Sequence, residues 1–253
     1  MEQRKGLSTL GQHRQTAGEL AKCQSHVLRL SDELNAFLHS VSHDLGAPLR
    51  AIVGFSEALQ EECGDRLGAA GLDYVGEIRA AGENMRLMLI GLTSLAQVGE
   101  GGIHPRLIDL SAIARELMVE LLKRDTDRDV RAVVSPDIRA YADPDLIREA
   151  IAELLDNSWR FTSVRAKATI EFGCGPDGSV YVRDDGAGFD MRNQAQLFAP
   201  FKVLHAKEDL GGLGLGLALV SRIVHLHGGQ VWARGEPGLG ATFSFTLPSN
   251  EAP

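Results

Sequence analysis

The sequence predicts two folding units: a helical hairpin that dimerises as a four-helix bundle, and an α/β domain that follows it. Two series of apolar residues, spaced alternately three and four apart, indicate two long helices. A glycine-bearing break, CGDRLGAAG at 63–71, separates the series and predicts the turn of the hairpin. After residue 105, short β-rich runs at 130–134, 168–173 and 180–184 alternate with helical patterns at 111–123, 145–161 and 216–227, which is typical of an α/β or α+β domain.

The two apolar series have the a/d spacing of a coiled-coil seam. They comprise Leu20, Cys23, Val27, Leu30, Leu34, Phe37 and Val41, then Val75, Ile78, Gly82, Met85, Leu89, Leu92 and Ala96. One hairpin cannot bury both of its faces, so two copies should pack together as a homodimer. A monomeric hairpin that packs on the rest of the chain is the alternative.

Domain boundaries follow from the composition along the chain. The stretch VGEGGIHP at 98–105 collects glycine and proline and ends the second helical series. We therefore expect a coiled-coil helix at 1–33, the hairpin at 34–100 and the α/β domain at 101–250.

Composition excludes several classes of protein. The 253 residues are 44% hydrophobic and 24% charged, as in an ordinary globular chain, and the net charge of −8 argues against a nucleic-acid partner. Cys23, Cys63 and Cys174 are isolated from one another, which indicates neither a disulfide framework nor a zinc site and suits a cytoplasmic location. The longest apolar stretch, 87–92, is too short for a membrane segment.

The first motif with chemical potential is FLHSVSHDLGAPL at 37–49. His43 comes two residues after Val41 of the seam, so it should point away from the dimer axis and be exposed. Asp44 beside it could hold or deprotonate one ring nitrogen, which would make the imidazole a nucleophile. Pro48 should produce a local kink. Taken alone, an exposed histidine beside an aspartate is more often a solvated helix face.

The second motif is DPDLIREAIAELLDNSWRFT at 143–162, in which Asp143 and Pro144 announce a helix start. Glu153 and Asn157 are four residues apart and share a helix face, where their oxygens could meet a hydrated Mg²⁺. Arg160, one turn further on, would supply positive charge for phosphate oxygens. Without further context, an amphipathic helix with a polar face explains the same pattern.

Two glycine-containing motifs follow. In VRDDGAGFD at 182–190, Asp184 could accept a hydrogen bond from an exocyclic amine, and Gly186 and Gly188 would let the backbone approach a planar ligand. In GGLGLGLAL at 211–219, a glycine-rich loop leads into a helix whose N-terminus could bind a triphosphate. The spacing fits neither a Walker nor a Rossmann loop.

In order and spacing these motifs together resemble the conserved boxes of the sensor histidine kinase family. FLHSVSHDLGAPL is similar to the phospho-acceptor box, ELLDNSWRFT to the asparagine box, VRDDGAGFD and GGLGLGLAL to the two glycine boxes, and LFAPFK to the phenylalanine box. The resemblance covers about 34–248 and is strongest to the phytochrome-like and PAS-linked subgroup. It implies a dimerisation and histidine phosphotransfer hairpin, then an ATP-binding α/β sandwich of the gyrase and heat-shock-chaperone type.

The resemblance also implies roles for single residues. His43 would accept the γ-phosphate of ATP, Asp44 would orient or deprotonate the imidazole, and Glu153 would help to polarise the acceptor. Asn157 would hold Mg²⁺. The nucleotide would be bound by Arg160, in place of the usual lysine, by Asp184 at the adenine amino group, by Gly186 and Gly188 at the base, and by Gly212, Leu213, Gly214, Leu215 and Gly216 at the phosphates, with Phe198 and Phe201 bracing a lid at about 190–212.

The implied activity is ATP-dependent autophosphorylation on His43, followed by phosphoryl transfer to an aspartate of a response regulator. A gyrase-type ATPase, or a dimeric scaffold without turnover, is the alternative. Residues 1–35 show no sensor domain, so an upstream sensor has either been removed from this chain or resides in a partner, and the heptads, which look like a linker helix, favour removal.

Ala47 departs from the family pattern, in which Thr or Asn commonly lies four residues after the acceptor histidine and positions a water that dephosphorylates the partner. A methyl group cannot hydrogen-bond a water. We therefore predict weak phosphatase activity, measured as loss of phosphate from a purified phosphorylated regulator in the absence of ATP. Rapid loss on addition of this protein would contradict the prediction.

Overall fold

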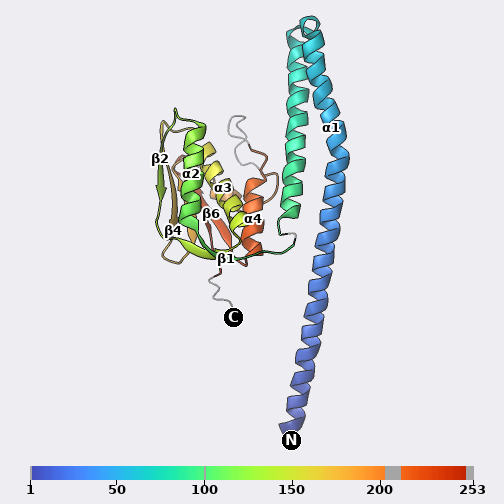
Figure 1. Ribbon diagram of the computed structural model, residues 1–253, viewed down its shortest axis with the longest axis vertical. Helices are drawn as coiled ribbons and strands as arrows, with labels where there is room; N and C mark the ends of the chain where they lie inside the picture. The colour runs from blue at the N-terminus through green and yellow to red at the C-terminus, as the bar shows by residue number, and fades with distance from the viewer. Residues whose placement is uncertain (1, 100, 203–211, 249–253) are drawn as a thin grey trace. The chain divides into compact units, whose positions relative to one another are not determined.

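The computed structural model describes residues 2–99, 101–202 and 212–248, and the side chains of residues 2–35, 37, 39 and 195 lie outside the description (Figure 1). The chain divides into two compact units, Met1–Ala96 and Gln97–Pro253. Among the described helices, none combines the length and apolarity that crossing a membrane requires.

The first unit is a helical hairpin built from α1, Glu2–Gln97. Gly68, with φ of 66° and ψ of 175°, is the residue inside α1 with non-helical backbone angles, and the chain reverses there into two arms that lie side by side (Figure 1). The positive φ explains why glycine stands at the turn. The predicted hairpin and the predicted position of its turn are therefore confirmed. Pro48 lies within the first arm.

The arms of the hairpin touch along a narrow seam. Leu49, Val53 and Val75 are buried, and a Cβ added to Gly82 would come within 2.8 Å of Val53 Cγ2. Many other large apolar side chains of the hairpin are exposed: Leu45, Ile52, Phe55, Leu59, Leu72, Tyr74, Ile78, Met85, Leu87, Met88 and Ile90. The predicted seam residues from Leu20 to Phe37 lie outside the described side chains.

The second unit is an α/β sandwich. Its five-stranded sheet has the order β2-β4-β5-β7-β6, in which β2 and β4 are parallel and the other neighbours antiparallel. The strands are β2 Asp129–Val134, β4 Lys167–Cys174, β5 Val180–Asp184, β6 Val231–Glu236 and β7 Gly240–Phe245. Helices α2 Leu110–Arg124, α3 Pro144–Phe161 and α4 Gly216–Leu226 cover one face of the sheet (Figure 1). The predicted α/β sandwich is confirmed.

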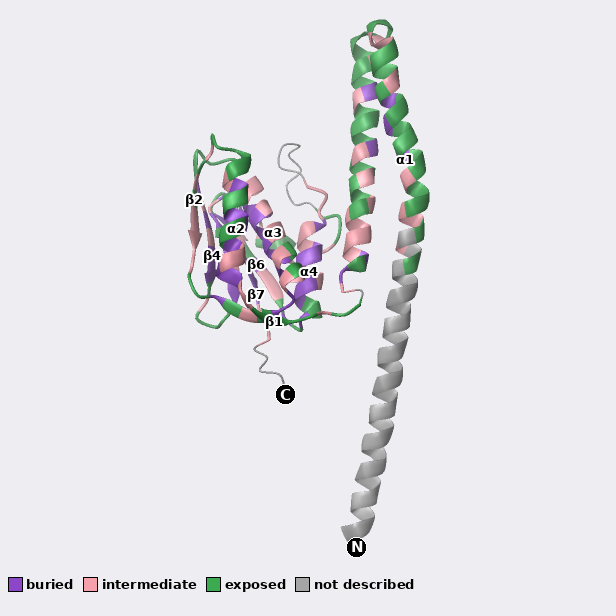
Figure 2. Cartoon of the chain, viewed as in Figure 1, coloured by how far each residue is buried: buried purple, intermediate pink, exposed green. Residues whose placement is uncertain are grey.

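Smaller elements complete this unit. Strands β1 Arg106–Asp109 and β3 Arg139–Ala142 form a separate two-stranded antiparallel sheet, and η1 Met191–Gln196 is a short 3-10 helix. The core lies between the large sheet and the helices, where the buried positions of both layers meet (Figure 2). Its largest fully buried side chains include Phe172 and Phe245 of the sheet.

Helix α3 is central to this core, and its start is fixed by polar contacts. Asp143 Oδ1 accepts hydrogen bonds from the backbone N–H groups of Asp145 and Leu146, and Pro144 occupies the first turn. Burial acts to raise the pKa of Asp143, but backbone N–H donors, with His104 the strongest, lower the pKa below its usual value. The apolar stripe Ile147, Ala150, Ile151, Leu154 and Leu155 is fully buried.

His227 ties the end of α4 to the start of α3. Its Nε2 accepts a hydrogen bond of 3.0 Å from the backbone N–H of Asp143, so Nδ1 carries the proton that is donated to the Ile223 carbonyl at 2.8 Å. Both nitrogens of this buried ring are therefore engaged. The contact joins segments 84 residues apart in the sequence.

Replacing Leu154 with Ala should lower the free energy of unfolding of the second unit by about 2–5 kcal/mol, because the site is fully buried and would leave a cavity. Urea unfolding followed by tryptophan fluorescence measures this, since both tryptophans, Trp159 and Trp232, belong to this unit. Leu239→Ala is the matched control at a position 67% exposed and should change the free energy by less than about 0.5 kcal/mol. Equal losses in the two variants would contradict the assigned core.

Candidate nucleotide site and phospho-acceptor histidine

Three polar residues predicted from the sequence, Glu153, Asn157 and Arg160, lie along α3. Asn157 is 6% exposed, and its Oδ1 accepts a hydrogen bond from Arg160 Nη2. Arg160 Nε is buried with no hydrogen-bond partner among the described residues, and the guanidinium lies 5.2 Å from the Phe161 ring centroid. An anion that accepted from Nε would satisfy this donor.

The glycine-rich loop passes directly against these side chains. A Cβ added to Gly212 would overlap the Arg160 guanidinium, and one added to Gly216 would overlap the Glu153 carboxylate. The structure thus brings the loop and α3 together, and a side chain at Gly212 or Gly216 would have to displace the Arg160 guanidinium or the Glu153 carboxylate from its present position. Burial raises the pKa of Glu153, Asp156 and Glu149 raise it further, and Arg160 opposes them.

The start of α4 leaves backbone donors available beside this loop. Leu215, which is buried, occupies the N-cap position and makes no side-chain capping hydrogen bond. The first N–H groups of a helix lack intrahelical partners and attract anions. The predicted triphosphate binding at Gly212–Gly216 is compatible with this end of α4, and Leu213 is half-buried.

Phe201 is linked to the same loop through the backbone. Its N–H donates to the Gly214 carbonyl at 2.8 Å, and its own φ of 62° lies in the left-handed region. Phe198 is half-buried, whereas the Phe201 side chain is exposed. Residues 203–211 of the predicted lid lie outside the described residues, so the bracing role of the two phenylalanines stays a prediction.

Asp184 ends β5 as a buried carboxylate, only 5% exposed. It accepts hydrogen bonds from Gly186 N–H at 3.0 Å and from Ser158 Oγ at 3.1 Å. Burial raises the pKa of Asp184 to about 6, although both of these donors lower it. A Cβ on Gly186 would overlap the Phe161 carbonyl and one on Gly188 the Glu236 carbonyl. The sequence analysis missed Ser158, whose position beside Asn157 was its only signal.

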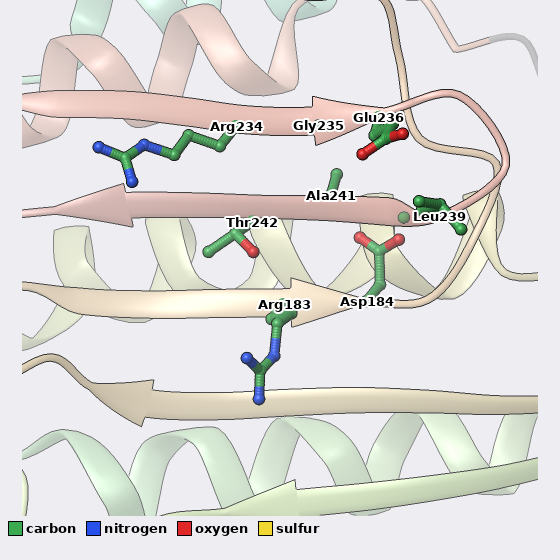
Figure 3. Close-up of a pocket in the computed structure, with 9 residues that line it drawn as sticks. Arg183, Asp184, Arg234, Gly235, Glu236, Leu239, Ala241 and Thr242 are labelled. Carbon is green, nitrogen blue, oxygen red and sulfur yellow. The ribbon is translucent and has the colours of Figure 1, made fainter.

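A hollow of about 310 Å³ lies along the ends of β5, β6 and β7 (Figure 3). It is lined by Arg183, Asp184, Arg234, Gly235, Glu236, Leu239, Gly240, Ala241 and Thr242. Among the residues predicted to bind the nucleotide, Asp184 alone lines it. The hollow is therefore distinct from the cluster that Glu153, Asn157 and Arg160 form with the glycine-rich loop.

His43 belongs to the first unit. Its side chain is 85% exposed, as the seam position predicts, and its Nδ1 lies 3.2 Å from Asp44 Oδ1. If Nδ1 carries the ring proton, this contact leaves the lone pair of Nε2 free to act as a nucleophile. Ala47, one turn further along α1, is exposed.

The described residues contain no group of three or more His, Cys, Asp or Glu that could hold a metal ion. A metal at the predicted position would have Asn157 as its protein ligand and would need other oxygens from elsewhere. Mg²⁺ fits this donor set, because it usually retains waters and binds substrate phosphates together with one or two protein groups.

Comparison with protein families agrees with this arrangement. Residues 33–101 match the His Kinase A (phospho-acceptor) domain, and residues 142–251 match the histidine kinase-, DNA gyrase B-, and HSP90-like ATPase. Together the two matched segments span well over half of the chain. The first holds His43 and the second holds Asn157, Asp184 and the glycine-rich loop.

Two curated relatives are similar in sequence to this chain over most of its length. Cyanobacterial phytochrome B of Nostoc sp. strain PCC 7120 is 31% identical over 92% of this chain and 32% of its own length. The methanogenesis regulatory histidine kinase FilI of Methanothrix harundinacea is 32% identical over 92% of this chain and 26% of its own length. The chain thus spans less than a third of the length of these relatives.

Solved structures share the fold. Full-length ShkA, crystallised in complex with AMPPNP, is 24% identical, with a TM-score of 0.57 over 83% of this chain and 45% of that one. The histidine kinase AdeS of Acinetobacter baumannii is 17% identical, with a TM-score of 0.52 over 81% of this chain and 98% of its own.

The fold and site define an ATP-binding α/β domain joined to a phospho-acceptor hairpin. The chain belongs to the sensor histidine kinases and carries the core of that family. The expected family is thereby confirmed, and the residue assignments remain predictions.

The raised pKa of Asp184 predicts a pH-dependent stability. Because the folded pKa, about 6, exceeds the ordinary value of 3.8, ionisation of Asp184 opposes folding at neutral pH, and this cost falls as the pH drops through 6. Asp184→Asn should therefore raise the free energy of unfolding at pH 8 by about 1–3 kcal/mol.

The increase in the free energy of unfolding that Asp184→Asn produces should shrink to roughly half at pH 5, because the folded wild-type carboxyl is mostly protonated there. Urea unfolding of both proteins at the two pH values measures the difference. Glu236→Gln, which removes an exposed carboxylate from the same hollow, is the control and should show little gain at either pH. A pH-independent gain for Asp184→Asn would contradict the assigned pKa.

Proposed function

We propose that this chain autophosphorylates His43 with ATP and passes the phosphoryl group to an aspartate of a response regulator. The observation that carries the proposal is the exposed His43, paired with Asp44 in a phospho-acceptor hairpin, on the same chain as an ATP-binding fold. A gyrase-type ATPase would need no such histidine or hairpin. A scaffold would need neither the unsatisfied Arg160 donor nor the close approach of the glycine-rich loop.

In the proposed reaction, His43 Nε2 attacks the γ-phosphorus of ATP. A nitrogen–phosphorus bond forms, the bond from phosphorus to the bridging oxygen breaks, and ADP leaves with that electron pair. The ring then carries the Nδ1 proton beside Asp44, whose carboxylate stabilises the positive charge that develops. Phosphoryl transfer depends mainly on positioning and charge neutralisation, so this nucleophile suffices.

The nucleotide would be held by the second unit. Asp184 would accept from the adenine amino group, and the N–H groups at the start of α4 would meet the phosphates. Asn157 Oδ1 would hold Mg²⁺, which supplies positive charge to the phosphate oxygens when bound. Arg160 would then exchange the Asn157 oxygen for a phosphate oxygen, while Glu153 helps to polarise the acceptor.

The proposed partners are a second copy of the chain and a response regulator. The exposed apolar side chains of the hairpin, such as Ile52, Ile78 and Met85, support the homodimer because one hairpin leaves them in water. A four-helix bundle of two hairpins would cover them.

Incubation with γ-labelled ATP and Mg²⁺ tests the proposal. The wild type should become labelled, the label should be lost in acid and stable in base, and His43→Gln should abolish it. His104→Gln is the matched control: His104 is also exposed, it donates to Asp143 through its backbone N–H, and the variant should be labelled to the same extent as the wild type. Base-labile label, or label retained in His43→Gln, would overturn the assignment.

Asn157→Ala should reduce labelling at least about 100-fold, because it removes the proposed protein ligand of Mg²⁺ from a site that works mainly by electrostatic stabilisation. Asn84→Ala, an exposed amide on the hairpin, should retain wild-type labelling. Steady ATP hydrolysis without any label would instead support the ATPase. Binding of a fluorescent ATP analogue without hydrolysis or label would support the scaffold.

A further inference from the structure

Two half-buried hydroxyl groups meet across the arms of the hairpin. Ser42 Oγ and Thr93 Oγ1 lie 2.8 Å apart, although they are 51 residues apart in the sequence. Thr93 Oγ1 also lies 2.8 Å from the carbonyl of Leu89, one turn earlier on its own arm. The seam residues on either side of this contact are mostly apolar, so the hydroxyl pair is a polar exception in it.

The number of hydrogens relates the two bonds to each other. A threonine hydroxyl carries a single hydrogen and two lone pairs. Thr93 can donate that hydrogen to Ser42 Oγ or to the Leu89 carbonyl, and both bonds form together when Thr93 donates to Leu89 and Ser42 Oγ donates to Thr93 Oγ1. In either case the Ser42–Thr93 hydrogen bond joins the two arms.

The Ser42–Thr93 hydrogen bond lies immediately beside His43, the proposed phospho-acceptor. Successive residues of an α-helix are about 100° apart around its axis, so anchoring Ser42 to the other arm fixes His43 about 100° away from that contact. Val53 and Gly82 hold the arms together three turns further on. Between these contacts Pro48 has no N–H for the Asp44 carbonyl, so the helix lacks one of its own hydrogen bonds next to His43.

We propose that the Ser42–Thr93 hydrogen bond is a positioning contact that fixes the rotation of the first arm and thereby the direction in which His43 presents Nε2. The inference rests on the proposed autophosphorylation. Ser42 and Thr93 act through His43 and touch neither the nucleotide nor the reacting atoms. A polar pair in an apolar seam is a known way to specify the alignment of two helices.

Steady-state autophosphorylation of the full chain tests this. Ser42→Ala and the isosteric Thr93→Val should each lower kcat between about twofold and tenfold. This is the change in an equilibrium constant that the loss of one hydrogen bond between neutral side chains produces. KM for ATP should not change. The double variant should be no worse than the worse single variant, because either change alone removes the bond. Thr93→Ser, which keeps the hydroxyl, should restore wild-type kcat.

Ser56→Ala is the matched control. Its hydroxyl is buried in the same arm and donates to the Ile52 carbonyl of its own helix at 2.7 Å, so among the described residues its loss removes a hydrogen bond within one arm and not one between the arms. It should leave kcat unchanged. Sedimentation should show the same assembly for every variant.

The inference would be overturned by unchanged kcat in Ser42→Ala and Thr93→Val, by additive losses in the double variant, or by an equal loss in Ser56→Ala. Failure of the proposed function looks different, because the wild type itself would then remain unlabelled. A loss of thermal stability without a loss of kcat would also overturn the positioning role, since a merely structural contact would give that result.

Discussion

The packing of α3 against the five-stranded sheet is the constraint on which the nucleotide site depends. Ile147, Ile151 and Leu154 are fully buried, which fixes both the rotation and the depth of the helix. Once that stripe is fixed, the helical repeat determines where the later residues of α3 lie. Ser158 then reaches Asp184 on β5, and Arg160 and Asn157 meet each other. The chemistry of the site thus follows from the burial of residues that take no part in it.

Burial also gives the site its electrostatic character. The pKa of Asp184 and that of Glu153 are both raised mainly by loss of solvent, so each carboxylate is less stable in the folded domain than it would be in water. A ligand that donates a hydrogen bond to Asp184 would recover part of this cost. Stability and ligand recognition are therefore coupled at the same atom, which is why Asp184→Asn should stabilise the domain while removing a group placed to accept from an amine.

The elements with strong periodicity could be predicted from the sequence, and contacts between distant residues could not. The amphipathic pattern of 145–161 and the alternation at 180–184 each reflect one buried face, so α3 and β5 were expected in the right places. Strands β1 and β3 have four residues each, too few for a period to show. The contact of His227 with Asp143 joins segments 84 residues apart, and no local pattern encodes it. Ser158 was missed for the same reason, since its importance lies in a partner on another strand.

The proposed exchange between Arg160 and a metal ion would let one amide oxygen serve two states of the site. In the structure the guanidinium donates to Asn157 Oδ1, so a cationic group already stands where the proposed Mg²⁺ would bind. Repulsion between the two positive charges would make Arg160 and the proposed Mg²⁺ compete for this oxygen. A phosphate oxygen near Arg160 would relieve the competition, because it would give the buried Nε an acceptor and draw the guanidinium away from Asn157. An arginine would suit the proposed exchange, because its planar group carries several donors and can keep one contact while it forms another.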